Sequence, residues 1–146
     1  MATVNVYLNF KGNCEEAFNF YKNVLGGEFS YLARYSEMPS HEEMPPVSDD
    51  DSNKIMHMSL PISKETVIMG SDYLDSWGPP LVVGNNTSLY LDVASKQEAD
   101  RVFDSLSKDG IVTMQMGDTF WGAYFGSLTD RFGINWMIGT ELSEEK

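Results

Sequence analysis

The sequence has one cysteine, few basic residues and no long apolar run, and each shortage excludes a class of protein. Cys14 is the only cysteine, so no intrachain disulfide can form and a reducing cytoplasm is the natural compartment. Lysine and arginine number 10 against 22 aspartates and glutamates, which gives a formal net charge of −12. This charge opposes binding to nucleic acid or to an anionic membrane, although an acidic excess is also a common solubility feature.

No apolar run approaches the roughly 18 residues that span a bilayer, so the sequence predicts no membrane partner. Residues 1–7 carry neither the basic nor the apolar segment of an export signal, which again favours the cytoplasm. What the chain does have is 42% hydrophobic residues and 12 glycines among 146 residues. This length and composition predict a single globular domain, residues 1–146, with a real core.

The chain begins with strict alternation and then changes to helical spacing. Alternation over residues 4–10 predicts a strand with one apolar face (Val4, Val6, Leu8, Phe10) and one polar face (Asn5, Tyr7, Asn9). Asn13 and Glu16 form an approximate capping box for a helix, and Gly26-Gly27 ends it. These signals predict a strand that leads directly into an amphipathic helix.

Three more strands are predicted in this half, at residues 28–35, 54–61 and 66–70. Alternation in 54–61 places Ile55, His57 and Ser59 on one face and Met56, Met58 and Leu60 on the other. Residues 36–53 and 71–86 are predicted loops. His41-Glu42-Glu43 in the first loop lacks the second histidine of a metalloprotease helix, so a solvated loop and a flap over a pocket are its two interpretations.

The same pattern then restarts. Residues 88–93 echo residues 5–10, Ser95 and Glu98 form a capping box, and Gly110 ends the second helix. A strand at 111–116 and an aromatic hairpin at 118–139 follow, with Asp130-Arg-Phe-Gly133 as the hairpin's turn and Trp136 as a core residue. The chain is therefore predicted to hold two copies of strand–helix–strand–strand–strand, module one at about 3–72 and module two at about 87–139.

One helix covers only one face of a four-stranded sheet, so the other face of each module must meet the second copy or a ligand. The residues predicted on that inner face are mostly aromatic or hydrogen-bonding, as in a half-open binding cleft. They are Asn5, Tyr7, Asn9, His57, Ser59, Ser88, Tyr90 and Asp92.

The order of these motifs resembles a known superfamily. The matching stretches are residues 7–21, Lys54-Ile-Met-His57, Phe120-Trp121-Gly122 and Asp130-Arg-Phe-Gly133 with Trp136. They are similar to the vicinal-oxygen-chelate superfamily, the glyoxalase and bleomycin-resistance fold, and within it to the PhnB-like branch. The resemblance implies an α+β fold of paired βαβββ modules, with a curved mixed sheet and two helices, and a homodimer.

The resemblance also implies which residues correspond to the metal ligands of the superfamily. In metal-dependent members, inner-strand side chains hold a divalent ion; those positions correspond here to Asn5, Ser88, Met69 and Met137. An amide, a hydroxyl and two thioethers are poor ligands for a hard cation. The sequence therefore favours a protein without a cofactor and without the family metal, with a divalent metal as the alternative.

His57 is the one imidazole on the predicted inner face, where it can act as a general base, bind a ligand, or simply bond within the sheet. Trp121, Tyr124 and Trp136 can stack on a flat ligand, pack in the core or form a dimer contact. Asp72 and Asp92 lie near the predicted cleft and are equally interpretable as turn or strand-end residues. Some relatives carry a methyltransferase label, but no Gly-rich loop joins a strand to a helix here, which argues against that activity.

The leading hypothesis is a cytoplasmic homodimer that binds a small organic molecule in a cleft between its modules. The predicted ligand-binding residues are Tyr7, Asn9, His57, Ser59, Tyr90, Asp92, Trp121 and Tyr124. The alternative is a metal-dependent or His57-dependent lyase, isomerase or dioxygenase, with His57 as the catalytic residue. A third interpretation is a filled cleft in a protein that serves only as an assembly partner. The sequence names neither the ligand nor a reaction.

Overall fold

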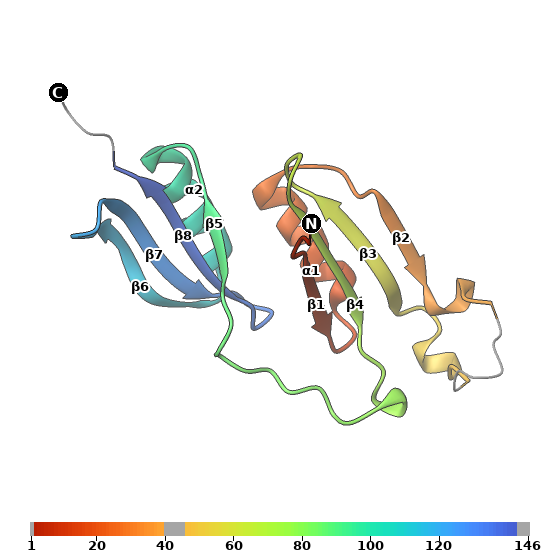
Figure 1. Ribbon diagram of the computed structural model, residues 1–146. Helices are drawn as coiled ribbons and strands as arrows, with labels where there is room; N and C mark the ends of the chain where they lie inside the picture. The colour runs from red at the N-terminus through yellow and green to blue at the C-terminus, as the bar shows by residue number, and fades with distance from the viewer. Residues whose placement is uncertain (1, 40–45, 143–146) are drawn as a thin grey trace. The chain divides into compact units, whose positions relative to one another are not determined.

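The computed structural model describes residues 2–39 and 46–142, so His41-Glu42-Glu43 lies outside the described residues. The chain forms two compact units, Met1–Val82 and Val83–Lys146, which contain the predicted modules one and two (Figure 1). Each unit holds one four-stranded mixed sheet and one long helix. The predicted α+β fold of paired βαβββ modules is confirmed, with a separate sheet in each module.

Module one arranges its strands in the order β1-β4-β3-β2, with β1 parallel to β4 and the other neighbours antiparallel. Short 3₁₀ turns η1 (Tyr35–Glu37), η2 (Asp49–Asp51) and η3 (Asp75–Trp77) lie in its connections. Its helix and strands are β1 (Val6–Phe10), α1 (Cys14–Leu25), β2 (Tyr31–Arg34), β3 (Ile55–Pro61) and β4 (Val67–Asp72).

Module two repeats this topology in the order β5-β8-β7-β6, and β5 is parallel to β8 as β1 is to β4. Its elements are β5 (Leu89–Asp92), α2 (Lys96–Ser107), β6 (Ile111–Asp118), β7 (Ala123–Thr129) and β8 (Asn135–Glu141). No helix among residues 2–39 and 46–142 is long and apolar enough to cross a membrane.

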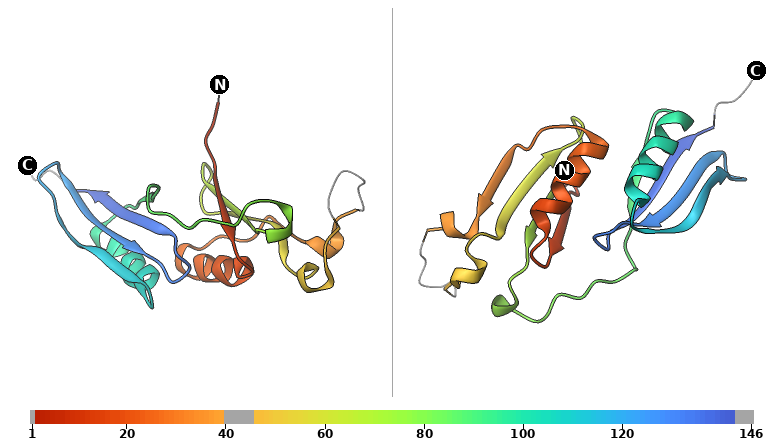
Figure 2. Two further views of the ribbon diagram at one scale, coloured as in Figure 1. Left: turned by 90° about the horizontal axis from the view of Figure 1, so that it is seen from below. Right: turned by 180° about the vertical axis from the view of Figure 1, so that it is seen from behind.

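Each helix lies against one face of its own sheet and buries an apolar stripe there (Figure 2). The buried helix residues are Cys14, Ala17, Phe18, Tyr21 and Val24 in α1 and Ala99, Val102, Phe103 and Leu106 in α2. Leu60 and Ile68 of module one and Leu128, Trp136 and Ile138 of module two pack from the strands. The sheet face opposite the helix is called the open face of each module below.

Only one of the two predicted helix caps is confirmed. The Ser95 side chain accepts a hydrogen bond from the Glu98 backbone N–H at 3.1 Å, as the capping box requires. Asn13 precedes α1 but makes no side-chain cap bond. The carboxylate of Asp72, at the end of β4, instead accepts the N–H groups of Gly12 and Cys14, each at 2.9 Å. The capping carboxylate therefore comes from about 60 residues further along the chain.

Strict alternation in β3 is also corrected by the structure. Ile55 was expected on the open face with His57, yet it is 1% exposed, whereas Met56 is half-buried. The register between β2 and β3 shifts at Ala33/Arg34, because Ala33 pairs with His57 and Arg34 with Ile55. This bulge turns Ile55 into the core while His57 stays on the open face. Val4, expected on the apolar face of β1, precedes the strand and is 98% exposed.

The aromatic hairpin near the end of the chain is confirmed as β7 and β8. Asp130 Oδ1 accepts the N–H groups of Phe132 at 2.9 Å and Ile134 at 3.0 Å, and Gly133 adopts φ +88°. This is the Asp-led turn that the sequence predicts. Trp136 is 2% exposed, and its Nε1–H donates to Asp130 Oδ2 at 2.9 Å, so the turn is tied to the core.

Candidate functional site

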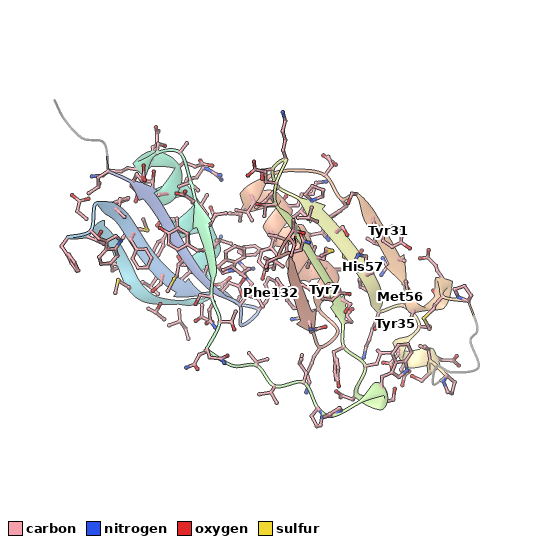
Figure 3. The ribbon with its side chains drawn as sticks, viewed as in Figure 1. Tyr7, Tyr31, Tyr35, Met56, His57 and Phe132 are labelled. Atoms are coloured by element: carbon pink, nitrogen blue, oxygen red, sulfur yellow. The ribbon has the colours of Figure 1, made fainter. Side chains whose placement is uncertain are left out.

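The open face of module one is organised around His57 (Figure 3). His57 Nδ1 lies 3.2 Å from the Tyr7 hydroxyl, and Nε2 lies 3.0 Å from Ser59 Oγ. The Tyr7 ring stacks on the imidazole at 5.5 Å between centroids, and the Tyr31 ring lies 5.6 Å away on β2. The structure thus brings together three of the residues that the sequence predicts as ligand-binding.

Asn9 continues this face one step along β1. It is exposed, and the Ser71 hydroxyl lies 3.5 Å from its Oδ1 as a donor. Asn5 and Ser88 are exposed as well, but each precedes its strand rather than belonging to it. Of the predicted polar face of β1, Tyr7 and Asn9 are therefore the residues that the sheet holds in place.

The open face of module two carries an aromatic row. Tyr90 on β5 stacks on Phe125 of β7 with centroids 6.1 Å apart, and Trp121 meets Phe125 edge-on at 5.8 Å. Gly139 of β8 allows this arrangement, because a Cβ there would collide with the Tyr90 hydroxyl. Tyr90 and Trp121 remain 54% and 58% exposed, so their rings are available to a ligand.

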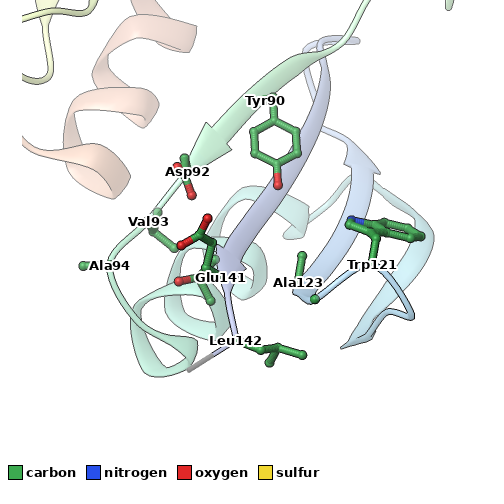
Figure 4. Close-up of a pocket in the computed structure, with 10 residues that line it drawn as sticks. Tyr90, Asp92, Val93, Ala94, Trp121, Ala123, Glu141 and Leu142 are labelled. Atoms are coloured by element: carbon green, nitrogen blue, oxygen red, sulfur yellow. The ribbon is translucent and has the colours of Figure 1, made fainter. Parts of the chain in front are cut away.

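A pocket of about 1070 Å³ opens beside these rings within module two (Figure 4). Tyr90, Asp92 and Trp121, all predicted from the sequence, line it together with Thr140 and Glu141. Its remaining lining residues are Val93, Ala94, Gly122, Ala123 and Leu142. The pocket therefore combines two flat rings with two carboxylates and the hydroxyls of Tyr90 and Thr140, which suits a ligand that has both a flat body and polar groups.

Tyr124 is placed elsewhere. Its hydroxyl donates to Asp100 Oδ1 of α2 at 2.6 Å, and Lys96 Nζ lies 4.9 Å from the centre of its ring. The hydrogen bond to Asp100 raises the pKa of Tyr124 to about 12. Because side chains alternate along a strand, Tyr124 lies on the helix side of β7 while Ala123 and Phe125 lie on the open side. Tyr124 is not among the residues that line the pocket.

The buried Asp72 holds together the helix and strands behind the open face of module one. Asp72 is 1% exposed and, besides holding the start of α1, accepts the Ile55 N–H at 2.8 Å through Oδ2. Its backbone carbonyl accepts the Tyr35 hydroxyl at 2.8 Å, and burial raises the pKa of Tyr35 to about 12. Burial, with Asp72 nearby, also raises the pKa of the Cys14 thiol, which keeps it protonated and unreactive. Asp72 thus proves to be a strand-end scaffold residue.

The positions of the family metal do not fit a divalent cation. Met69 and Met137 lie in register with Tyr7 and Tyr90 on the open faces, so thioethers occupy two of the four positions. Asn5 and Ser88 supply an amide and a hydroxyl, and hard cations prefer carboxylates and other oxygen ligands in larger number. Within the described residues, no three His, Cys, Asp or Glu side chains form a metal-binding group.

Sequence reasoning missed Phe125, Gly139 and Glu141. The internal repeat contains a signal for Phe125, because β4 and β8 hold Met69 and Met137 at equal register and therefore align His57 with Phe125. Glu141 lies at the end of β8, beyond the matching motifs. Nothing in the local sequence marks it as a pocket residue.

The two modules, each a βαβββ unit with an open sheet face, define a protein of the vicinal-oxygen-chelate fold. The chain belongs to the 3-demethylubiquinone-9 3-methyltransferase family, whose model matches residues 2–139. It is 36% identical to Protein YjdN of Escherichia coli over 137 residues, 90% of either chain.

Solved structures support the same assignment. Protein PA1353 from Pseudomonas aeruginosa is 36% identical with a TM-score of 0.85, over 98% of this chain and 100% of that one. The PhnB protein from Bacillus cereus is 25% identical with a TM-score of 0.73, over 95% and 99%. More distant likenesses, to glyoxalase/bleomycin resistance proteins at 13–15% identity and to a fosfomycin resistance protein from Listeria monocytogenes at 11%, show the fold alone. The predicted vicinal-oxygen-chelate fold and PhnB-like branch are confirmed.

Proposed function

We propose that this protein binds a small organic molecule without the family metal, and that it does so as a cytoplasmic homodimer. The observation that carries the binding proposal is the pocket of about 1070 Å³ on module two, lined by Tyr90, Asp92 and Trp121. Its volume is just above the range for small-molecule sites, about 300–1,000 Å³. The single cysteine, which can form no intrachain disulfide, supports a reducing, cytoplasmic setting.

The lining residues suggest what such a ligand offers. The exposed faces of Tyr90 and Trp121 suit a flat or apolar body, which gains free energy by leaving water. Asp92, Thr140 and Glu141 supply oxygen atoms that accept hydrogen bonds from polar groups at the ligand's edge. The ligand class is therefore an aromatic or alicyclic molecule with hydrogen-bond donors.

A thermal-shift screen tests this proposal. A ligand at one hundred times its dissociation constant stabilises the folded protein by about 2.7 kcal/mol, which raises the melting temperature by several degrees. Trp121→Ala should weaken binding of any such ligand by at least tenfold. Ile111→Ala is the control, because Ile111 lies in module two, is 66% exposed and does not line the pocket.

The same screen includes nickel, zinc and manganese ions. Because the four family positions hold an amide, a hydroxyl and two thioethers, these ions should leave the melting temperature unchanged. Stabilisation by one of them that a chelator reverses would contradict the metal-free proposal. If the Trp121 and Ile111 variants bind a ligand equally well, the pocket is not its site.

A second candidate function rests on a separate observation in module one. Both ring nitrogens of His57 meet hydroxyl groups, at 3.2 and 3.0 Å, so the imidazole is positioned to accept a proton on one side and donate one on the other. This favours a His57-dependent enzyme as the alternative. Loss of turnover in a folded His57→Gln variant, once a substrate is known, would support it.

The proposed homodimer is tested by sedimentation at micromolar concentration. A mass twice that of the 16.4 kDa chain is expected. A monomer at all concentrations would remove this part of the proposal and leave the pocket unaffected.

A further inference from the structure

Tyr7 and Tyr90 occupy equivalent places in the two modules. Tyr7 pairs in register with Met69, which pairs with Ser59; Tyr90 pairs with Met137, which pairs with Ser127. Each tyrosine is about half exposed, 44% for Tyr7 and 54% for Tyr90. The two phenols thus have the same strand neighbours and similar access to solvent.

The two tyrosines differ in the ring on which they stack. Tyr7 lies on His57 at 5.5 Å and 30° between ring planes, and Tyr90 lies on Phe125 at 6.1 Å and 24°. His57 and Phe125 also hold the same register position relative to Met69 and Met137. The geometry of the ring pair is repeated, and only one copy contains a base.

The hydrogen bonds of His57 indicate which of its ring nitrogens can accept the Tyr7 proton. A neutral imidazole has one N–H donor and one acceptor nitrogen. When Nε2–H donates to Ser59 Oγ, 3.0 Å away, Nδ1 is the acceptor and faces the Tyr7 hydroxyl at 3.2 Å. Ser59 is only 8% exposed and Tyr7 is 44% exposed, so Ser59 is the inner end of the row Tyr7–His57–Ser59 and Tyr7 is the end that meets solvent.

We propose that Tyr7 is a nucleophilic phenol, that His57 is the base that takes its proton, and that Ser59 positions the imidazole. A nucleophile within hydrogen-bond reach of a base, with a third group that orients the base, is the general arrangement of an activated nucleophile. The site suits a small electrophile with a polarised carbonyl or sulfonyl group. It lies on module one and does not depend on the pocket of module two.

An arylsulfonyl fluoride serves as the probe. The Tyr7 oxygen forms a bond to sulfur and the sulfur–fluorine bond breaks, so that an aryl sulfonate ester and fluoride result. The phenol proton passes to His57 Nδ1, which leaves an imidazolium whose Nε2–H still donates to Ser59. The step is a substitution at sulfur, so no oxidant or reductant takes part.

The experiment compares labelling rates of Tyr7 and Tyr90 in one sample, read by peptide mass spectrometry. Tyr7 should be labelled at least tenfold faster than Tyr90 at neutral pH. His57→Phe, which places the module-two residue in module one, should reduce the Tyr7 rate to that of Tyr90. His57→Gln should reduce it equally, because an amide keeps a hydrogen bond but does not take a proton. Rescue by glutamine would show that His57 has only a structural role.

Two further variants change Ser59 in module one and Phe125, the equivalent of His57, in module two. Ser59→Ala should slow Tyr7 labelling severalfold and leave Tyr90 unchanged. Phe125→His brings an imidazole to Tyr90, with Ser127 at the position that Ser59 has in module one, and should accelerate Tyr90 labelling. Ser127 Oγ already lies 2.7 Å from the Thr113 hydroxyl, so a smaller increase than the Tyr7 to Tyr90 ratio is expected.

Equal labelling of Tyr7 and Tyr90 in the unaltered protein would overturn the proposal. So would a Tyr7 rate that both His57 variants leave unchanged while circular dichroism shows an intact fold. Neither result affects ligand binding in the pocket of module two, and loss of that binding leaves the Tyr7 measurement intact. The failures of the two proposals are therefore distinguishable.

Discussion

The two modules share a topology and a register, yet different carboxylates hold them together. In module one the buried carboxylate is Asp72, at the end of β4, where it joins the start of α1 to β3. In module two that register position is Thr140, and the buried carboxylate is Asp130, in the turn between β7 and β8. The scaffold of each copy is thus stabilised by a different polar contact.

The open faces behave in the opposite way. The Tyr–Met–Ser row across three strands is the same in both modules, and so is the stacked ring pair. Within that row and ring pair, the one difference is His57 against Phe125. The comparison teaches that the polar ties within a βαβββ module can be exchanged while the residues that face outward keep their pattern, which is expected if that pattern contacts a ligand.

The largest loss of folding stability is expected from Asp72→Asn. The carboxylate accepts three backbone N–H groups at 2.8–2.9 Å, two of them in buried bonds, and an amide presents its own N–H₂ to at least one of these donors. We expect a loss of about 3 kcal/mol in the free energy of unfolding, measured with urea. Asp75→Asn, an exposed neighbour, should change it by less than about 0.5 kcal/mol. Equal effects would contradict the role of Asp72.

Asp130→Asn tests the corresponding tie of module two. One amide oxygen can still accept from the turn, so the principal loss is the bond to Trp136 Nε1. A decrease of about 2 kcal/mol in unfolding free energy is expected, with altered near-ultraviolet circular dichroism from Trp136. Asp109→Asn is the control, because Asp109 is exposed and forms a long ion pair with Arg131, at 3.6 Å. No difference between the variants would argue against Asp130 as a tie.

Gly139→Ser gives the open face of module two the residue that module one has at the same register, Ser71. A side chain at 139 displaces the Tyr90 ring, which can turn about its two side-chain bonds, so a stability loss of only about 1 kcal/mol is expected. Ligand affinity of the pocket should fall by about fivefold, measured by calorimetry. Ser71→Gly should leave that affinity unchanged; an unaltered affinity in the serine variant would exclude the Tyr90 ring from binding.

The smallest expected effect is a loss of folding stability at high pH, which comes from two tyrosines. Burial raises the pKa of Tyr35, and a hydrogen bond to Asp100 raises that of Tyr124, each to about 12. The folded protein therefore holds both phenols protonated, and this stabilisation is complete below the unfolded pKa near 10 and disappears as pH rises towards 12. Ultraviolet titration of Asp100→Asn should show one tyrosine ionising earlier. Tyr35 should be unaffected, since its shift comes from burial.

The sequence predicted the duplication, both helices and the aromatic hairpin because these depend on neighbours within a few residues. Ser95 and Glu98 lie on one helical turn, and Asp130 and Gly133 lie in one four-residue turn, so their roles are local. Strand bounds differ by up to three residues, as in β2, which begins at Tyr31 rather than at residue 28. Hydrogen bonds to partner strands set those ends.

Prediction from sequence failed where a distant residue intervened. Asn13 makes no side-chain cap bond, and Asp72 from the end of β4 accepts the Cys14 N–H at the start of α1. Ile55 leaves the alternating pattern because a bulge opposite Arg34 and the bond to Asp72 turn it inward. Of the residues predicted for the candidate site, Tyr7, His57, Ser59, Tyr90, Asp92 and Trp121 lie on open faces or at the pocket. Tyr124 lies on the helix side of β7, where it bonds to Asp100.

By itself, the sequence determined the family, the two βαβββ modules and the chemistry of the residues at the metal positions, because each follows from residue type and local spacing. Tertiary structure alone decided which of those residues meet. The row Tyr7–His57–Ser59 arises because β1, β4 and β3 pair in one register, and the module-two pocket because Gly139 leaves room for the Tyr90 ring. Contacts between strands far apart in the chain depend on register and packing, which no local pattern encodes.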